Sequence, residues 1–172
     1  MNKFSMLIFF YFCLIPTKQT KIMQEILRSE LQEKQEKLDC RYLRMATVWA
    51  ENSYCKRRQV GALIVKDKMI ISDGYNGTPS GFENICEDET NTTKPYVLHA
   101  EANAITKVAK SSNSSEGATL YVTATPCIEC AKLIIQAGIN RVVYSEDYRS
   151  SDGKDLLVRA GIETKFIEIK NF

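Results

Sequence analysis

The stretch Ala118–Tyr144 reads ATLYVTATPCIECAKLIIQAGINRVVY and decides the fold of this chain. Residues 118–124 are rich in β-branched and apolar side chains, which predicts a strand. Pro126 then begins a helix and Gly138 ends it, because proline is favoured in the first turn of a helix and glycine just beyond the last. Residues 141–144 predict the next strand. A strand, a helix and a strand in this order predict two parallel strands joined by a helical crossover.

The same alternation extends on both sides of this stretch and predicts a three-layer α/β domain. Its central sheet is expected to have five strands, to be mixed but mostly parallel, to carry helices on both faces and to begin with an antiparallel hairpin. The further elements expected are a hairpin of strands 60–65 and 69–72, a helix over 99–110, a helix over 156–160 and a last strand over 162–169. Residues 75–95 show no period, and a loop this long in a compact domain is usually functional.

The chain before the hairpin predicts two helices. Over 23–38 the composition is Glu/Lys/Gln-rich, and the apolar residues of the Ile22–Leu31 stretch fall at helical spacing, which predicts an amphipathic helix. Its apolar side could pack within the chain or contribute to a subunit contact. Asp39 is expected to cap a second helix that ends near Asn52.

Residues 1–22 contain an apolar run, Met6–Ile15, that follows Lys3. The run is too short to span a bilayer as a helix. Three interpretations are open: a translated upstream stretch with the true start at Met23, a signal or anchor, or an ordinary buried or partner-contacting segment. The expected organisation is an N-terminal extension over 1–22, a helix over 23–38 and one α/β domain over 39–172.

Composition excludes several classes of protein. The 172 residues carry 23 Lys+Arg against 21 Asp+Glu, so the net charge is 23 − 21 = +2, too small for an electrostatic nucleic-acid binder. We therefore expect no nucleic-acid partner and no membrane association. The six cysteines do not suggest a disulfide scaffold, since the chain is longer than the small domains that depend on one, and metal or redox use is favoured instead.

His99, Cys127 and Cys130 are the candidate metal ligands. Cys127 and Cys130 lie three residues apart, hence on the first turn of one helix, whose positive end favours thiolates. His99 begins another expected helix. Three ligands of this type leave a tetrahedral Zn²⁺ with one open position, which is the mark of a catalytic site.

Other interpretations of these residues are open. A lone Cys-x-x-C pair also fits buried thiols or a redox dithiol, and a lone histidine is more often structural. A redox dithiol, however, has no use for the nearby His-x-Glu. A structural zinc with four ligands could recruit Cys55 or Cys86.

Glu101 is the candidate catalytic residue. On a helix it points about 200° away from His99, so it is not expected to bind the metal. A carboxylate beside the site can instead carry a proton to and from the reacting groups. The combination of His-x-Glu with Pro-Cys-x-x-Cys is the signature of zinc nucleoside and nucleobase deaminases. These enzymes replace the exocyclic amine of the base by an oxygen from water and release ammonia.

With these motifs, the chain resembles the deoxycytidylate (dCMP) deaminase family of the cytidine deaminase-like superfamily over residues 39–169. The resemblance includes CKRRQVGA at 55–62, GYNGTPSG at 74–81, AKLIIQAGI at 131–139 and Asp147-Tyr148. It implies a three-layer α/β/α cytidine deaminase-like fold and a hydrolase acting on the C–N bond of a cyclic amidine. The implied reaction turns dCMP into dUMP and ammonia and supplies dUMP for thymidylate synthesis.

The resemblance also implies roles for individual residues. Zinc is implied at His99, Cys127 and Cys130, with Glu101 as the proton shuttle. Asn76 matches a residue that contacts the sugar, and Tyr148 an aromatic position near the pyrimidine. Ala100 and Thr125 are expected to offer backbone groups to the base.

Arg57 and Arg58 are the candidates for the substrate phosphate, because a guanidinium can meet phosphate oxygens bidentately. A solvated turn is the alternative for both. Arginines do not distinguish dCMP from dCTP. Glu129 is expected to face water.

The resemblance implies further partners. Some family members bind a second, structural zinc through positions matching Cys55 and Cys86, but Val97 stands where such members have a ligand. Family enzymes are often hexamers with dCTP and dTTP as effectors and Mg²⁺ beside the effector, and we expect a cytoplasmic homo-oligomer. Two other functions fit the same zinc ligands: a tRNA adenosine or other cytosine or nucleotide deaminase, and a non-catalytic, zinc-stabilised nucleotide-binding module.

Overall fold

The computed structural model describes residues 18–147 and 150–169. Contacts within the chain separate two units, Met1–Leu38 and Asp39–Phe172. The second unit contains the sheet and all the candidate site residues. The apolar run at Met6–Ile15 lies outside the described residues. Among the helices of the described ranges, none has the length and apolar character needed to cross a membrane.

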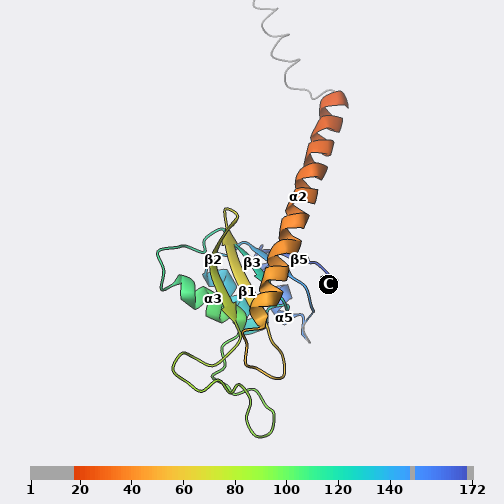
Figure 1. Cartoon of the computed structure of the whole chain (residues 1–172). Helices are drawn as coiled ribbons and strands as arrows, with labels where there is room; N and C mark the ends of the chain where they lie inside the picture. Colours follow the sequence, from red (N-terminus) through yellow and green to blue (C-terminus); the bar gives the residue numbers. More distant parts are fainter. Residues whose placement is uncertain (1–17, 148–149, 170–172) are drawn as a thin grey trace, which may run out of the picture. The chain divides into compact units, whose positions relative to one another are not determined.

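A five-stranded mixed sheet forms the centre of the second unit (Figure 1). Its strands are β1 (Gly61–Lys66), β2 (Met69–Tyr75), β3 (Thr119–Val122), β4 (Arg141–Tyr144) and β5 (Glu163–Phe166). They lie in the order β2-β1-β3-β4-β5. The pairs β2/β1 and β1/β3 are antiparallel, whereas β3/β4 and β4/β5 are parallel. The predicted mixed sheet is confirmed. It has two antiparallel and two parallel pairs rather than mostly parallel ones, because β1 of the hairpin pairs with β3 in the antiparallel direction.

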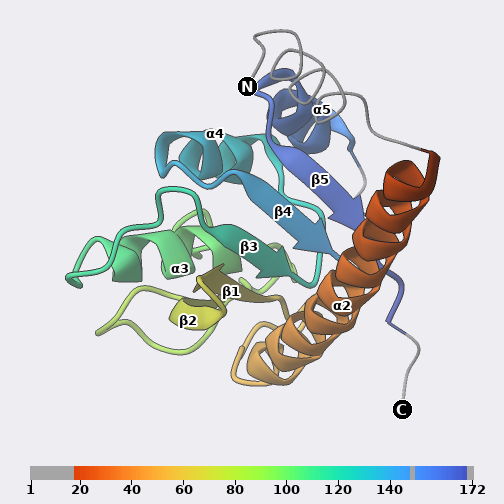
Figure 2. The same ribbon diagram turned by 90° about the horizontal axis from the view of Figure 1, so that it is seen from above.

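Helices cover both faces of this sheet, as predicted (Figure 2). On one face lie α3 (Ala100–Val108), α4 (Ile128–Gln136) and α5 (Asp152–Arg159). Their core residues pack against the side chains of alternate strand positions, including Ile64, Leu120 and Val142. On the other face, Leu43 and Ala46 of α2 (Lys18–Ala50) pack against Leu63, Val65, Tyr121 and Val143. The alternation of strand side chains thus produces two cores.

The connection between β1 and β2 confirms the predicted hairpin. Asp67 and Lys68 both have positive φ, 51° and 64°. Two successive residues with positive φ form the tight turn whose twist matches that of paired strands.

The prediction of two N-terminal helices is wrong, because a single helix, α2, spans Lys18–Ala50. Asp39 is not a cap: its side chain is fully buried and accepts hydrogen bonds from Tyr121 Oη (2.8 Å) and from Nη1 and Nη2 of Arg141 (2.9 and 2.8 Å). A carboxylate satisfied by three donors from the sheet leaves the helix backbone free to continue through it.

The apolar side chains of the Ile22–Leu31 stretch are exposed. Ile22, Ile26, Leu27 and Leu31 keep 49%, 50%, 55% and 56% of their surface accessible. Within their own unit these side chains are not buried, and packing within the chain and a subunit contact both stay predictions.

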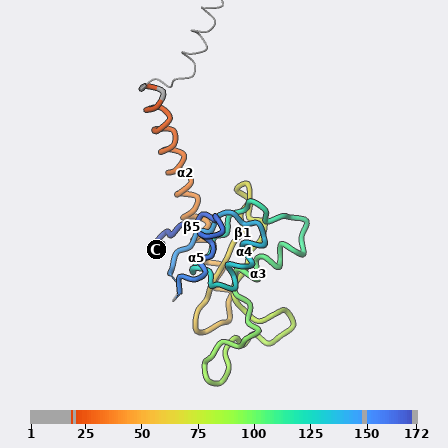
Figure 3. The backbone as a smooth tube through the Cα atoms, turned by 180° about the vertical axis from the view of Figure 1, so that it is seen from behind, coloured from red at the N-terminus to blue at the C-terminus, as the bar shows by residue number. Residues whose placement is uncertain are grey.

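Two connections meet at one end of the sheet, the one from α2 to β1 and the long one from β2 to α3 (Figure 3). As expected, residues 76–99 form no helix or strand beyond two isolated bridges, Gly77↔Leu98 and Glu87↔Thr93. A disulfide between Cys55 and Cys86 ties the two connections together. The expectation that the six cysteines serve metal or redox chemistry rather than disulfides is wrong for this pair. Sulfurs bonded to each other do not supply a second zinc site, the alternative that remained open for Cys55 and Cys86.

Candidate active site and metal centre

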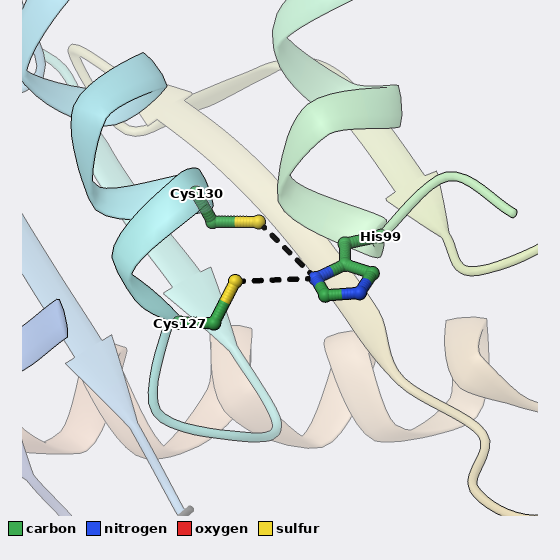
Figure 4. Close-up of side chains that lie close together, drawn as sticks. All are labelled: His99, Cys127 and Cys130. Atoms are coloured by element: carbon green, nitrogen blue, oxygen red, sulfur yellow. Dashed lines mark hydrogen bonds between the residues drawn. The ribbon is translucent and has the colours of Figure 1, made fainter. Parts of the chain in front are cut away.

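Two helix N-termini bring the three candidate ligands together. His99 is the N-cap residue of α3 and Cys127 that of α4, and neither side chain caps its own helix. Both side chains turn instead toward the space between the helices, where Cys130 joins them from the first turn of α4. Nδ1 of His99 lies 3.4 Å from Sγ of Cys127 and 3.4 Å from Sγ of Cys130 (Figure 4).

The donor set fits a zinc ion. All three ligand atoms lie within 4.8 Å of one another. A nitrogen and a sulfur bound to one tetrahedral Zn²⁺ lie about 3.5 Å apart, given bond lengths of about 2.0 and 2.3 Å. The separations of 3.4 Å therefore match shared coordination to within about a tenth of an ångström. Within the described ranges this is the one group of three such residues close enough to hold a metal.

Charge also favours a cation here. Hydrogen bonds from Cys130 and His99 lower the pKa of the Cys127 thiol to about 3. The hydrogen bond with Cys127 and burial raise the pKa of Cys130, while the hydrogen bond with Cys127 raises the pKa of His99. Without a metal, the protein thus favours a thiolate at Cys127 and a proton on its neighbours Cys130 and His99. A divalent cation is the charge that would stabilise both thiolates and a neutral imidazole together.

Glu101 lies beside this cluster but outside it. It is 4% exposed, and its carboxyl lies next to Cys130. Burial raises its pKa above the usual range of a glutamate. A carboxyl group with a raised pKa takes up and releases a proton more readily near neutral pH than an exposed one.

A cavity of about 270 Å³ opens over the cluster, and most of the predicted site residues line it. They are His99, Cys127, Glu101, Asn76, Arg57, Arg58, Ala100 and Thr125. Cys130 is buried behind them. Tyr148 lies outside the described residues.

The side-chain amide of Asn76 forms two hydrogen bonds with the backbone of the cavity wall. Its Oδ1 accepts a hydrogen bond from the Val60 amide (2.8 Å), and its Nδ2 donates to the Arg58 carbonyl (2.8 Å). An amide side chain has two donors and two acceptor sites, so one of each is left for a ligand hydroxyl. The predicted sugar contact is therefore compatible with a second role in holding residues 58–60.

The two arginine side chains each contact at least one neighbouring side chain. Nη2 of Arg58 forms an ion pair with Oε2 of Glu146 at 2.6 Å. Nη1 of Arg57 donates to Oγ1 of Thr93 at 3.1 Å. Arg57 is exposed and Arg58 is half-buried, so the alternative of a solvated turn stays open for Arg57, and the phosphate role of both stays a prediction.

Thr125 and Glu129 have different surroundings. The Thr125 hydroxyl donates to the Glu146 carbonyl (3.0 Å), which fixes the strand end just before the cysteine pair. Glu129 pairs with Lys132 at 2.6 Å, and its side chain is 73% exposed. The expectation that Glu129 faces water is confirmed.

Glu87 and Thr93 also line the cavity and were missed by the sequence analysis. Glu87 is 7% exposed although it belongs to a loop without any period. The signal that could have found it is its position next to Cys86, which the sequence analysis had singled out.

A mixed sheet with His/Cys/Cys ligands at two helix N-termini and a buried glutamate beside them defines a zinc-dependent hydrolytic deaminase. A family model described as the cytidine and deoxycytidylate deaminase zinc-binding region matches residues 36–146. The chain belongs to this family.

Relatives and solved structures agree. ComE operon protein 2 of Bacillus subtilis (strain 168) is 39% identical over 133 residues, which cover 74% of this chain and 70% of that protein. The deoxycytidylate deaminase of Saccharomyces cerevisiae is 33% identical over 159 residues, covering 87% of this chain and 51%, about half, of the yeast protein. The crystal structure of dCMP deaminase from cyanophage S-TIM5 in complex with dCMP and dUMP matches with a TM-score of 0.72 and 45% identity, covering 80% of this chain and 97% of that one.

Proposed function

We propose that the protein is a zinc-dependent dCMP deaminase, which converts dCMP and water into dUMP and ammonia and supplies dUMP for thymidylate synthesis. One observation carries the proposal: the His99/Cys127/Cys130 cluster and the buried Glu101 lie in the same cavity as Asn76 and the two arginines. The relatives named deoxycytidylate deaminase support the same substrate.

The three ligands would hold Zn²⁺, which when bound supplies an activated water near neutral pH. Glu101 would accept a proton from the attacking water, a role supported by its buried carboxyl beside Cys130. Glu101 would pass this proton to the ring nitrogen as the C–O bond forms at the ring carbon, and would then pass the second proton, from the new hydroxyl, to the amine. The C–N bond breaks, the hydroxyl oxygen becomes the carbonyl oxygen of dUMP, and the amine leaves as ammonia. The raised pKa of Glu101 suits both transfers.

The cavity wall would bind the rest of the nucleotide. The free donor and acceptor of Asn76 suit a sugar hydroxyl. Arg57 has N–H groups beyond the one given to Thr93 and can use them for phosphate oxygens. Ala100, the buried first residue of α3, and Thr125 border the same cavity and would contact the base, together with Tyr148.

Ammonia release from a panel of substrates tests the proposal. The panel is dCMP, dCTP, deoxycytidine, cytosine and a tRNA stem-loop, each with and without a metal chelator. We expect turnover of dCMP above the others and its loss with the chelator. Editing of the tRNA without nucleotide turnover would contradict the substrate, and nucleotide binding without any ammonia would indicate a non-catalytic module.

We further propose a cytoplasmic homo-oligomer that responds to dCTP and dTTP, with Mg²⁺ beside the effector phosphates. The exposed apolar residues of the Ile22–Leu31 stretch support a contact between copies. Zinc-binding thiols are kept reduced in the cytoplasm, and burial of Cys55 and Cys86 would shield their disulfide from the reductants there. Light scattering with and without dCTP and Mg²⁺ tests the assembly.

A further inference from the structure

The loop between β2 and α3 contains a small hairpin, residues 86–94, that borders the cavity. Glu87 and Thr93 form an antiparallel bridge, and the Lys94 amide donates to the Cys86 carbonyl at 2.8 Å. At its tip, the Asp88 carboxylate accepts from the amides of Thr90 and Thr92 (2.9 Å each). The 86–94 hairpin is thus internally bonded from base to tip.

This hairpin is joined to the segment that carries the arginines. The Cys55–Cys86 disulfide provides one connection. Glu87 provides a second: its Oε1 accepts from the backbone amides of Lys56 (3.0 Å) and Arg57 (3.2 Å). Because Glu87 is almost fully buried, its carboxylate loses hydration, and these two hydrogen bonds offset part of that loss.

Thr93 holds the other end of the same arginine. Its Oγ1 accepts from Nη1 of Arg57 at 3.1 Å. Glu87 and Thr93 are bridge partners, so one pair of neighbouring residues fixes both the backbone and the guanidinium of Arg57. All three residues line the cavity.

We propose that Glu87 and Thr93 are positioning residues that hold Arg57 ready for the substrate phosphate and so make the enzyme prefer a nucleotide over a nucleoside. This inference rests on the proposed function, in which Arg57 binds the phosphate. A guanidinium that is already oriented loses less conformational entropy when phosphate binds, which increases affinity without a new contact. The two amides that donate to Glu87 also reduce the electrostatic repulsion between its carboxylate and a phosphate bound at Arg57.

The experiment compares kcat/KM for dCMP with kcat/KM for deoxycytidine, which has no phosphate, in full-length variants with measured zinc content. Thr93→Val removes the hydroxyl that accepts from the Arg57 guanidinium and keeps the shape of the side chain. Glu87→Ala removes the carboxylate that accepts from the amides of Lys56 and Arg57. In both we expect the ratio to fall about three- to tenfold, the value of one hydrogen bond, mainly through a higher KM for dCMP. Arg57→Ala is expected to lower the ratio more than either.

Conservative variants separate positioning from folding. Thr93→Ser and Glu87→Gln keep an oxygen that can accept the same hydrogen bonds, so each is expected to restore most of the ratio. Thr92→Val is the matched control, since Thr92 lies beside Thr93 but outside the cavity lining. If Glu87→Ala does not fold, Thr93→Val alone decides.

Two results would overturn the inference, and they differ. An unchanged ratio in Thr93→Val, together with a lowered ratio in Arg57→Ala, removes the role of the hairpin and leaves the phosphate role of Arg57 intact. An unchanged ratio in Arg57→Ala removes both, while dCMP turnover itself would still stand.

Discussion

Gly74 lies so close to Ala100 that a Cβ atom at position 74 would be 2.2 Å from the Ala100 carbonyl oxygen and 2.6 Å from the Ala104 amide nitrogen. The first turn of α3 therefore rests directly on the backbone of β2. Two side chains reinforce the contact: Ser72 Oγ donates to the Ala104 carbonyl (2.7 Å), and Asn103 Nδ2 donates to the Tyr75 carbonyl (2.9 Å). The helix that begins at His99 and carries Glu101 is in this way fixed to the strand that leads into Asn76.

Replacing Gly74 by alanine should disturb this contact. The added methyl group meets backbone atoms that cannot move without shifting α3, so we expect a loss of stability of about 1–3 kcal/mol and weaker zinc binding. Thermal unfolding and metal analysis measure both. Gly77→Ala is the control for stability, because its nearest neighbour would be 3.9 Å away. Unchanged stability and zinc affinity in Gly74→Ala would contradict the close contact.

Glu101→Gln should separate metal binding from catalysis. Glutamine keeps the shape of the side chain but cannot carry the proton, so we expect an unchanged zinc content and a loss of turnover of about 10²- to 10⁴-fold. Metal analysis and ammonia release report the two properties independently. Turnover close to that of the unmodified protein would remove Glu101 from the mechanism.

Asp39→Ala should be strongly destabilising. Arg141 is half-buried and donates two hydrogen bonds to Asp39, so removing the carboxylate leaves a poorly solvated charge, at a cost of about 3–5 kcal/mol. Chemical denaturation measures this loss. Glu33→Ala breaks the exposed pair with Lys37 and should leave the unfolding midpoint unchanged. Similar midpoints for the two variants would argue against the buried network.

Removing the disulfide should lower stability without removing the metal site. The bond closes a loop with a sequence separation of 31 residues, for which chain entropy gives about 3–4 kcal/mol. The double variant Cys55→Ser/Cys86→Ser should therefore melt at a lower temperature than the oxidised protein and bind the same amount of zinc. Reductant should lower the melting temperature of the unmodified protein but not that of the variant, and an equal effect on both would contradict a disulfide.

Metal removal should expose a reactive thiolate at Cys127. Its pKa of about 3 lies far below that of an ordinary thiol, so the group is ionised across the whole range above about pH 4. In chelator-treated protein, alkylation of Cys127 should persist at pH 5, and added zinc should suppress it. Peptide mass spectrometry identifies the modified residue. Alkylation that disappears below pH 7 would show that the thiol has no such shift.

Local patterns were enough to predict most of the fold. The β1–β2 hairpin and the β3–α4–β4 unit depend on alternation, on turn residues and on Gly138, all of which act over a few residues. The convergence of His99 with Cys127 and Cys130 was also predictable, since His99 and Cys127 each begin a helix and Cys130 lies in the first turn of the second one.

The features that the sequence analysis missed depend on distant partners. Asp39 stands before an apolar stretch, as an N-cap would, but its partner Arg141 lies 102 residues further on. The residues around Asp39 carry no information about a contact this distant in the sequence, so they cannot show that Asp39 pairs with Arg141 instead of capping a helix. The pairing of Cys55 with Cys86 and the burial of Glu87 likewise arise from the folding of a loop without periodicity, whose course is set by contacts at its far ends.

The position of Asp39 within α2 has a practical consequence for the design of N-terminal truncations. A shortened version that starts at Met23 or anywhere up to Asp39 would keep the carboxylate that neutralises Arg141, the first residue of β4. Deleting one residue more would leave a guanidinium under the sheet with its main counter-ion gone, and such a product should aggregate during expression.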